Sequence, residues 1–307
     1  MQVQWILIFG LAVALLVFAR SMTSAAAQTR AYFGTLRLWR SLWPFSKGKG
    51  LPRITRPLLK PCVPIWVQVE PGVRLHLDAN NLISRVILET GVWDQDTWLA
   101  MERHLAPGAT FVDIGAHDGY CSLKGARIVG PAGRVLAVEA NPEMVTVLEK
   151  NIQASGARGI QVLPFACSDN EGVLTLFSAS QSNTGSSSLS KANASQYGEP
   201  GQSYQVASRT LDAIIQKAGV SRVDLIKVDV EGAELLILKG ALETLAHYRP
   251  ALLLELDDQL LQPMGTSAAE VTEFLRAYGY VRGGQYDDAN FEFLPVTTTQ
   301  SDPVPRA

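Results

Sequence analysis

Charged and apolar side chains alternate along residues 224–234, which read DLIKVDVEGAE. On an extended strand Lys227 and Asp229 lie on the same face, and a lysine inside a parallel sheet is costly unless it is paired. Asp229 or a ligand carboxylate could be its partner. Glu231 follows in the turn after the strand, and Glu234 begins a helix whose dipole favours an acid. The stretch predicts Lys227, Asp229 and Glu231 as catalytic candidates; the alternative is an acid-rich helix start with Lys227 reaching solvent.

A glycine-bearing turn follows the apolar strand in residues 111–119, which read FVDIGAHDG. Gly115 allows a ligand to approach the backbone closely, and Gly119 allows the turn to close against the next helix. In a doubly wound sheet, ligands bind at the carboxyl ends of the strands where the strand order reverses. The spacing is GxxxG, and no GK[ST] follows, so a dinucleotide or a triphosphate is disfavoured.

An acid ends the second strand of the predicted sheet, in the motif AVEANP. Glu139 lies 24 residues after Gly115, where a carboxylate can accept hydrogen bonds from both hydroxyls of a ribose. The alternative is a surface acid before a helix that Asn141 caps and Pro142 begins. Ribose binding indicates an adenosine-bearing cofactor and does not separate NAD from S-adenosylmethionine.

Polar residues also follow the third strand. Ser168 or Asp169 lies where an adenine edge would be read, although an ordinary turn explains Asp169 equally well. Further along, residues 178–195 contain eight serines, and this segment is either a solvated loop or a lid over a substrate.

The elements that must position these residues are short apolar strands alternating with helices, a pattern that predicts a doubly wound α/β domain with a parallel sheet covered on both faces. A hairpin around Pro71-Gly72 and two helices precede them. The expected strands are 110–114, 134–139, 161–166, 224–230 and 251–256, with extra strands at 173–177 and 204–208. The expected helices are 82–90, 96–105, 119–129, 142–155, 210–218 and 232–246.

Composition excludes several classes of protein. With 307 residues, 47% hydrophobic and 18% charged, the chain is neither largely disordered nor a polytopic membrane protein. Cys62, Cys121 and Cys167 show no CxxC spacing, which argues against a zinc ribbon or a disulfide scaffold. The net charge of −2 gives no reason to expect a nucleic-acid partner.

The first 60 residues differ from the rest, because they carry nine basic side chains and no acidic one. Residues 5–19 form an uncharged apolar run, and we predict a hydrophobic membrane-anchor helix over residues 1–20. The basic flank then places the remainder of a single-pass protein in the cytoplasm. The alternatives are a signal peptide cleaved near Ala25–Ala27, with export of the domain, and a soluble helix.

Residues 21–60 predict a basic, aromatic linker at the membrane surface, with Phe33 and Arg37 among the side chains suited to lipid headgroups. The alternative is a disordered basic tail. We assign the globular domain to residues 61–295 and a flexible tail to residues 296–307.

The motifs VDIGAHDGY, AVEANP, SSSL, RTLD and LIKVDVEGAELLILKGA resemble those of the FkbM-type family of S-adenosylmethionine-dependent methyltransferases. The resemblance covers roughly residues 80–260 and implies a Rossmann-like class I methyltransferase fold with a mostly parallel seven-stranded sheet. It implies that the methyl donor lies along the loop after the first strand, with ribose at Glu139 and adenine near Ser168 and Asp169. The implied loop contacts are Asp113, Gly115, Ala116, His117 and Gly119. His117 and Asp118 depart from the family pattern, which has a small polar and a β-branched residue there.

The resemblance further implies O-methylation of a sugar, a glycolipid or a natural product, in which the acceptor oxygen attacks the methyl group in line. Asp229 or Glu231 could take the acceptor proton. We expect no metal; the alternative is Mg²⁺ held by Asp229, Glu231 and Glu255. The anchor favours a lipid-linked glycan or another small-molecule acceptor, and the sequence leaves the oligomeric state open. The other functions to be tested are a non-catalytic, membrane-tethered adenosine-binding module and an NAD-dependent oxidoreductase.

Overall fold

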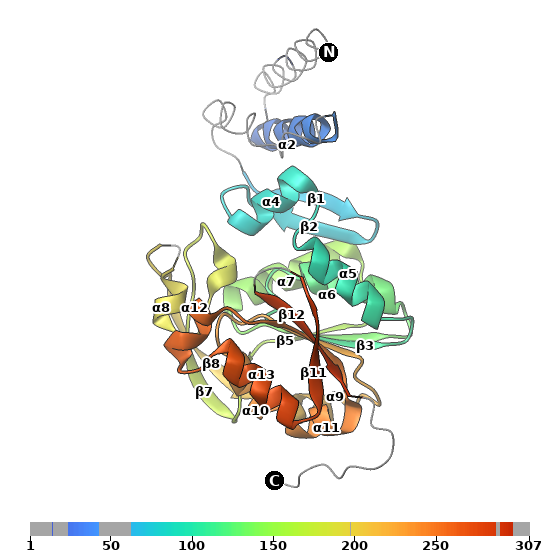
Figure 1. Cartoon of the computed structure of the whole chain (residues 1–307). Coiled ribbons are helices and arrows are strands. Elements are labelled where there is room, and N and C mark those ends of the chain that lie inside the picture. Colours follow the sequence, from blue (N-terminus) through green and yellow to red (C-terminus); the bar gives the residue numbers. More distant parts are fainter. Residues whose placement is uncertain (1–13, 15–23, 43–62, 197, 287–288, 297–307) are drawn as a thin grey trace. The chain divides into compact units, whose positions relative to one another are not determined.

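A computed structural model describes residues 14, 24–42, 63–196, 198–286 and 289–296, which belong to two compact units, residues 1–93 and 94–307 (Figure 1). Nearly all of the predicted anchor, and all but one residue of the predicted tail, lie outside the described residues, so both stay predictions. Among the residues that are described, none of the helices combines the length and the apolar character needed to cross a bilayer.

The first unit contains helix α2 (Ala25–Leu42), the hairpin of β1 (Ile65–Glu70) and β2 (Val73–Leu77), and helix α4 (Leu82–Thr90). The hairpin turns at Pro71-Gly72, as predicted. Asn81 caps α4 by accepting a hydrogen bond from the Ser84 backbone N–H, and Gly91 ends the helix in the left-handed conformation with φ 88°. Local cap signals therefore set both ends of this helix.

Residues 21–60 were predicted to be a linker, but part of them forms helix α2, which packs against other elements of the first unit. The side chains of Tyr32 and Phe33 are buried, and the rings meet edge to face with centroids 5.0 Å apart. Arg37 donates to the carbonyl oxygens of Ile87 and Leu88, at 2.9 and 2.8 Å, near the end of α4. A cation near the end of a helix interacts favourably with its last carbonyl groups. Phe33 and Arg37 thus contact other parts of the first unit, while a position of residues 21–60 at the membrane surface stays a prediction.

The second unit is built on a seven-stranded sheet in the order β11-β12-β10-β9-β3-β4-β5. The five strands from β10 to β5 are parallel, whereas β12 is antiparallel to β10 and to β11. The doubly wound, mostly parallel seven-stranded sheet is confirmed. The strands are β3 (Thr110–Ile114), β4 (Arg134–Val138), β5 (Ile160–Leu163), β9 (Leu225–Val228), β10 (Ala251–Glu255), β11 (Tyr280–Gln285) and β12 (Asn290–Pro295).

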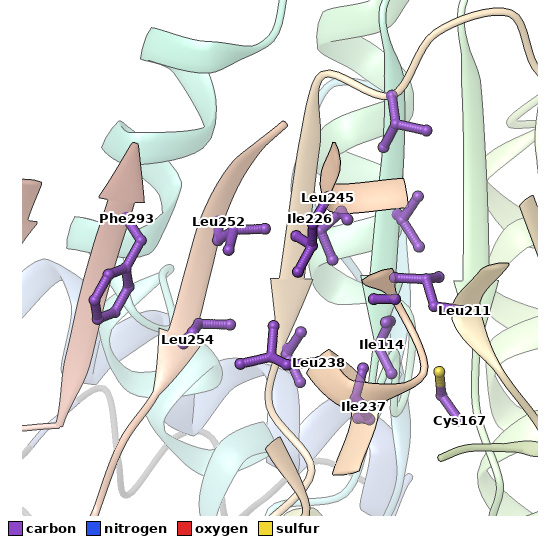
Figure 2. Close-up of a cluster of buried hydrophobic side chains, with 14 of the residues drawn as sticks. Ile114, Cys167, Leu211, Ile226, Ile237, Leu238, Leu245, Leu252, Leu254 and Phe293 are labelled. Carbon is purple, nitrogen blue, oxygen red and sulfur yellow. The ribbon is translucent and has the colours of Figure 1, made fainter. Parts of the chain in front are cut away.

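Helices cover both faces of this sheet, because alternate side chains of each apolar strand are buried on opposite sides. Phe111, Val135 and Leu225 pack on one face, which is covered by α5 (Gln95–His104), α6 (Tyr120–Val129) and α7 (Pro142–Ser155). Ile114, Ile226 and Leu252 pack on the other face (Figure 2). That face is covered by α9 (Leu211–Ala218), α10 (Glu234–Lys239), α11 (Leu242–Tyr248) and α13 (Ala268–Ala277).

The predicted strand 161–166 proves to be two strands in different sheets. Pro164, which has no backbone N–H to continue the ladder, follows β5, and the chain then enters β6 (Ala166–Cys167) of a three-stranded sheet. In this sheet β6 pairs with β8 (Ser203–Arg209), which pairs on its other side with β7 (Gly172–Phe177), in the order β6-β8-β7. The extra strands expected near 173–177 and 204–208 are therefore confirmed, and they form a separate sheet.

The predicted helix 232–246 is also divided, into α10 and α11 around Gly240. A Cβ atom at Gly240 would lie 2.1 Å from the Ser168 carbonyl oxygen, so this close approach requires glycine. Strands β11 and β12 and helix α13 were not among the predicted elements. The remaining short helices of the described part are η3 (Thr184–Ser186), α8 (Lys191–Ala194), α12 (Asp258–Leu261) and η4 (Gln262–Met264).

Candidate functional site

The loops after β3 and β9 meet where the strand order of the sheet reverses. From β3 the chain proceeds through β4 to β5 on one side, and it returns through β9 to β10 on the other. Gly115 has φ +83°, and a Cβ atom there would lie 1.9 Å from the Asp229 carbonyl oxygen. Only glycine permits this contact, which brings the predicted ligand loop against the predicted catalytic strand.

The loop from Gly115 to Gly119 is held by backbone hydrogen bonds. The N–H groups of Gly115 and Ala116 both donate to the Val138 carbonyl oxygen, each at 3.0 Å. Gly119 precedes α6 with φ +88°, and a Cβ atom there would lie 2.5 Å from Leu148 Cδ1 on α7. Both glycines singled out in the sequence therefore occupy positions that a side chain would disturb.

Glu139 ties this loop to the start of α7. One carboxylate oxygen accepts the His117 backbone N–H at 2.8 Å, and the other accepts the Asn141 backbone N–H at 2.7 Å. Glu139 is buried, which does not fit the alternative of a surface acid, and its burial raises the pKa against the effect of these hydrogen bonds. The Ala140 backbone N–H also donates to this carboxylate, which has room for a further hydrogen bond. Asn141 does cap α7, through the Glu143 N–H at 3.0 Å.

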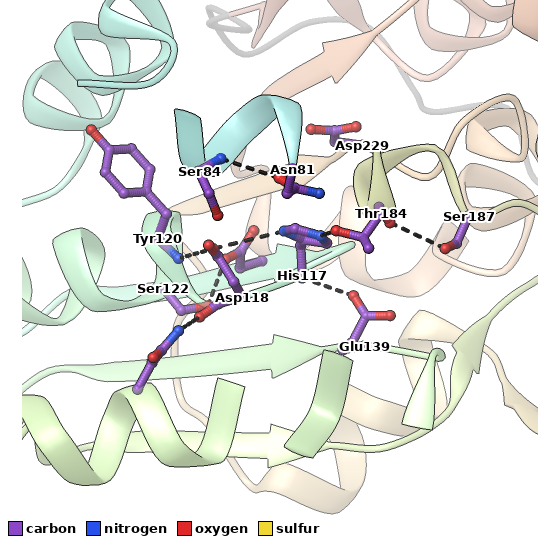
Figure 3. A network of polar contacts seen from close by, with 12 residues as sticks. Asn81, Ser84, His117, Asp118, Tyr120, Ser122, Glu139, Thr184, Ser187 and Asp229 are labelled. Carbon is purple, nitrogen blue, oxygen red and sulfur yellow. Dashed lines mark hydrogen bonds and ion pairs between the residues drawn. The ribbon is translucent and has the colours of Figure 1, made fainter. Parts of the chain in front are cut away.

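His117 connects the same loop to the serine-rich segment (Figure 3). Its backbone is left-handed, with φ 50°, and its Nε2 lies 2.9 Å from the Thr184 hydroxyl. The Asp118 carboxylate is 3.8 Å from Nδ1. Burial lowers the pKa of His117, but the acids Asp118 and Glu139 outweigh this effect, so that the pKa lies above its ordinary value. His117 is thus a structured part of the loop.

Lys227 and Asp229 form the predicted pair, with Nζ 2.8 Å from a carboxylate oxygen. The Lys227 side chain is 8% exposed and that of Asp229 is 41% exposed, so the ammonium is inside the sheet and the carboxylate reaches the surface. This arrangement excludes the alternative of a lysine that extends into solvent. Burial opposes ionisation of Asp229, but the Lys227 charge outweighs it and lowers the pKa of Asp229.

Asp113 lies directly opposite Lys227 in the register of β3 and β9. Its side chain is fully buried; Ser122 Oγ donates to one oxygen at 2.5 Å, and the other oxygen has no hydrogen-bond partner among the described residues. Burial, opposed by the Lys227 charge, raises the pKa of Asp113 to about 6. The sequence placed Asp113 in the ligand loop, whereas the structure places its carboxyl inside the sheet.

Three further acids gather around Asp229. Burial, together with the charge of Asp229, raises the pKa of Glu231 to about 8, and burial raises that of Glu234 to about 7. The pKa of Glu255 is raised well above its usual range by burial and by the neighbouring acids. Oxygens of Asp229, Glu231 and Glu255 lie within 4.8 Å of one another, so the three ligands of the alternative Mg²⁺ site are together.

Ser168 and Asp169 lie at the end of β6 in the three-stranded sheet, and not at a strand tip of the main sheet. The Ser168 N–H donates to the Arg209 carbonyl oxygen at 2.9 Å, and its hydroxyl donates to Asp169 at 3.2 Å. Ser168 is buried and Asp169 is exposed. Their role in binding adenine stays a prediction.

The serine-rich segment supplies contacts that the sequence did not assign. Asn141 Nδ2 donates to Ser187 Oγ at 3.3 Å, while Ser188 and Asn193 donate to the carbonyl oxygen of Glu231. The density of side-chain donors in residues 178–195 and the SSSL motif within them are the signals in the sequence that pointed to this segment. The choice of partners depends on the tertiary fold.

The family model described as the methyltransferase FkbM domain matches residues 113–282, which is more than half of the chain and includes the Gly115 loop, Glu139 and the Lys227–Asp229 pair. The chain belongs to the FkbM methyltransferase family. The family resemblance stated from the motifs is thereby confirmed.

Relatives of this FkbM methyltransferase match over shorter stretches. Protein-L-isoaspartate O-methyltransferase 1 of Arabidopsis thaliana is 44% identical over 57 residues, which are 19% of this chain and 25% of that protein. Arsenite methyltransferase of Halobacterium salinarum is 33% identical over 91 residues, 29% of this chain and 22% of that protein. The chain therefore spans about a quarter of the length of these curated relatives.

Among solved structures, the methyltransferase FkbM from Methylobacillus flagellatus KT is similar with a TM-score of 0.43 and 16% sequence identity. The alignment covers 69% of this chain and 52% of that one.

Proposed function

We propose that this FkbM-family protein is an S-adenosylmethionine-dependent methyltransferase that methylates a hydroxyl group of a sugar, a glycolipid or a natural product. The observation that carries the proposal is the contact between the Gly115 loop and the Asp229 backbone at the reversal of strand order. Family membership supports methyl transfer, and this contact places a ligand loop beside a set of ionisable groups.

The residues around the loop fit the proposed donor. Glu139 keeps an acceptor position for a ribose hydroxyl, although its carboxylate already accepts the backbone N–H groups of His117, Ala140 and Asn141. Gly115 removes the side chain that would otherwise stand between the loop and the tip of β9. S-adenosylmethionine supplies an electrophilic methyl group on its sulfonium centre.

Different acids at the tip of β9 can bind the acceptor and remove its proton. Asp229 is ionised and fixed by Lys227, so it can hold and orient an acceptor hydroxyl. Glu231, with a pKa of about 8, is the stronger base once it is deprotonated, and a base is most effective when its pKa lies near the operating pH. We assign Glu231 as the general base, Asp229 as the orienting acid and Lys227 as its support.

The acceptor and the cellular location are proposed from the sequence. A membrane anchor in residues 1–20, if it holds the domain at the cytoplasmic face, favours a lipid-linked glycan or a glycolipid as the acceptor. The curated relatives are methyltransferases with different acceptors, so they support methyl transfer as the chemistry and do not specify the acceptor of this chain.

Titration calorimetry with S-adenosylhomocysteine and, separately, with NAD tests the proposal. We expect the homocysteine compound to bind and NAD not to bind. Glu231→Gln and Asp229→Asn should keep this affinity within about threefold, while transfer of labelled methyl groups from S-adenosylmethionine to a cell glycolipid extract falls by about 100-fold.

Each alternative function predicts a different result in the same assays. Binding of NAD alone would indicate an oxidoreductase, and binding of S-adenosylhomocysteine without transfer to any cellular extract would indicate a non-catalytic module. Full transfer by both the Glu231→Gln and the Asp229→Asn variants would reject the assigned base. Glu243→Gln, an acid on α11 outside the site, is the matched control and should behave as the wild-type protein does.

A further inference from the structure

The serine-rich segment makes two hydrogen bonds, from buried side chains, to the turn that carries Glu231. Ser188 Oγ and Asn193 Nδ2 both donate to the Glu231 carbonyl oxygen, each at 2.8 Å. Ser188 is 1% exposed and Asn193 is 3% exposed. Because water cannot replace them easily, two shielded donors on one carbonyl fix the orientation of that peptide group.

The peptide that they hold is in an unfavourable conformation. Glu231 has φ 58°, in the left-handed region, which is unfavourable for a residue with a side chain. Such a conformation persists only where surrounding contacts impose it, and it occurs preferentially at functional sites. The two donors from the serine-rich segment are contacts of this kind. Ser186 adds a hydrogen bond to the Glu231 carboxyl itself.

Asn193 also joins this turn to a second part of the chain. Its Nδ2 also donates to the Leu260 carbonyl oxygen on α12 at 2.8 Å. The amide group of Asn193, on α8, therefore bridges the Glu231 turn and α12 (Figure 1). The neighbouring Gly232 shows how closely they pack. A Cβ atom there would lie 2.3 Å from the Leu260 carbonyl oxygen and 2.8 Å from Asn193 Nδ2.

The same segment contacts the loop on the other side of the site. Thr184 is hydrogen-bonded to His117, and Ser187 to Asn141. Residues 184–193 therefore connect the tip of β3, the start of α7 and the tip of β9. A solvated loop would not make side-chain hydrogen bonds to all three.

We propose that Asn193, assisted by Ser188, is a positioning residue that holds the backbone of Glu231 in its left-handed conformation and so directs the Glu231 carboxyl to the acceptor. The inference rests on the proposed function. It assigns residues 184–193 a direct part in arranging the acids at the tip of β9, although none of their side chains needs to touch the acceptor.

Three single substitutions test this role. Asn193→Ala removes both bridging bonds, and Ser188→Ala removes the other donor to the Glu231 carbonyl oxygen. Ser195→Ala is a matched control, because the hydroxyl of this half-buried serine donates to the Lys191 carbonyl oxygen within its own segment, at 2.7 Å. We expect Asn193→Ala to lower kcat for methyl transfer to the glycolipid extract by about 10- to 100-fold, since small displacements of reacting groups have effects of this size. The affinity for S-adenosylhomocysteine should stay within about twofold. Ser188→Ala should lower kcat less, and Ser195→Ala should leave it unchanged.

Hydrogen exchange provides a readout that does not depend on activity. The Gly232 amide should exchange at least about tenfold faster in Asn193→Ala than in the wild type, and at the wild-type rate in Ser195→Ala. If Asn193→Ala does not fold, Ser188→Ala carries both measurements.

Two results separate the possible failures. A wild-type kcat and wild-type exchange at Gly232 in both the Asn193→Ala and Ser188→Ala variants would overturn the positioning role, and so would equal losses of kcat and of S-adenosylhomocysteine affinity. If the wild-type protein itself binds no S-adenosylhomocysteine, the proposed function fails. Hydrogen exchange then still decides whether Asn193 fixes the Glu231 turn, and unchanged exchange rejects it.

Discussion

Replacing Asp113 by Asn tests how the sheet accommodates a buried acid beside Lys227. Asp113 is fully buried, and its pKa is raised from 3.8 to about 6 by burial, against the Lys227 charge. A carboxyl whose pKa is raised in the folded state binds its proton more tightly there than in the unfolded chain. The free energy of unfolding therefore declines as the pH rises from about 4 to about 6, and the Asn variant is free of this loss.

The size of the effect follows from the shift in pKa. A difference of about two pKa units corresponds to about 3 kcal/mol once Asp113 is ionised, and no reduction for solvent exposure applies because the side chain is fully buried. About half of this, roughly 1.5 kcal/mol, develops between pH 5 and pH 8. The amide oxygen of Asn can still accept the Ser122 hydroxyl, so the change is close to isosteric.

The assay is urea unfolding of both proteins at pH 5 and pH 8, with S-adenosylhomocysteine titration at pH 8. The stability of Asp113→Asn relative to wild type should rise by about 1.5 kcal/mol between the two pH values. Asp96→Asn, at an exposed acid of α5, is the control. Its free energy of unfolding should differ from that of the wild type by the same amount at pH 5 and at pH 8. A relative stability that falls at pH 8 would refute the reasoning, because it would mean that Asp113 is ionised and stabilised by Lys227.

The remaining predictions concern the loop, the base and the cation. Gly115→Ala should weaken S-adenosylhomocysteine binding at least about tenfold in calorimetry, because its Cβ would lie 1.9 Å from the Asp229 carbonyl oxygen; unchanged affinity would place the donor elsewhere. The rate of methyl transfer should rise between pH 7 and pH 9 as Glu231 loses its proton, and Glu231→Gln should abolish this rise. EDTA should leave the rate unchanged, because Lys227 and Glu255 already pair with Asp229; a loss that Mg²⁺ restores would assign the three acids to a metal site.

Local patterns in the sequence were sufficient for the parallel core of the fold. Strands of four to six apolar residues between amphipathic helices have a period that does not depend on distant contacts, and so β3, β4, β9 and β10 were predicted nearly to their ends. The antiparallel edge was not predicted, because β11 includes Gly283 and Gly284 and is largely exposed. Its pairing with β12 depends on tertiary contacts.

The candidate site divides in the same way. The pairing of Lys227 with Asp229 followed from the two-residue period of a strand, and the need for glycine at position 115 followed from a turn beside a ligand site. By contrast, the close approach of Gly240 to Ser168, which divides α10 from α11, involves residues 72 positions apart in the chain. No local pattern contains such a contact.

The sequence by itself determined the family, the class of fold and the identity of the acids at the end of β9, because motif, period and residue type are all local properties. Only the tertiary structure decided which of these acids are ionised and which backbone conformation they adopt. Burial and neighbouring charges separate the ionised Asp229 from the largely protonated Glu231, and contacts from residues 186–193 hold Glu231 in the left-handed conformation. Both effects depend on which groups the fold brings within a few ångströms of one another.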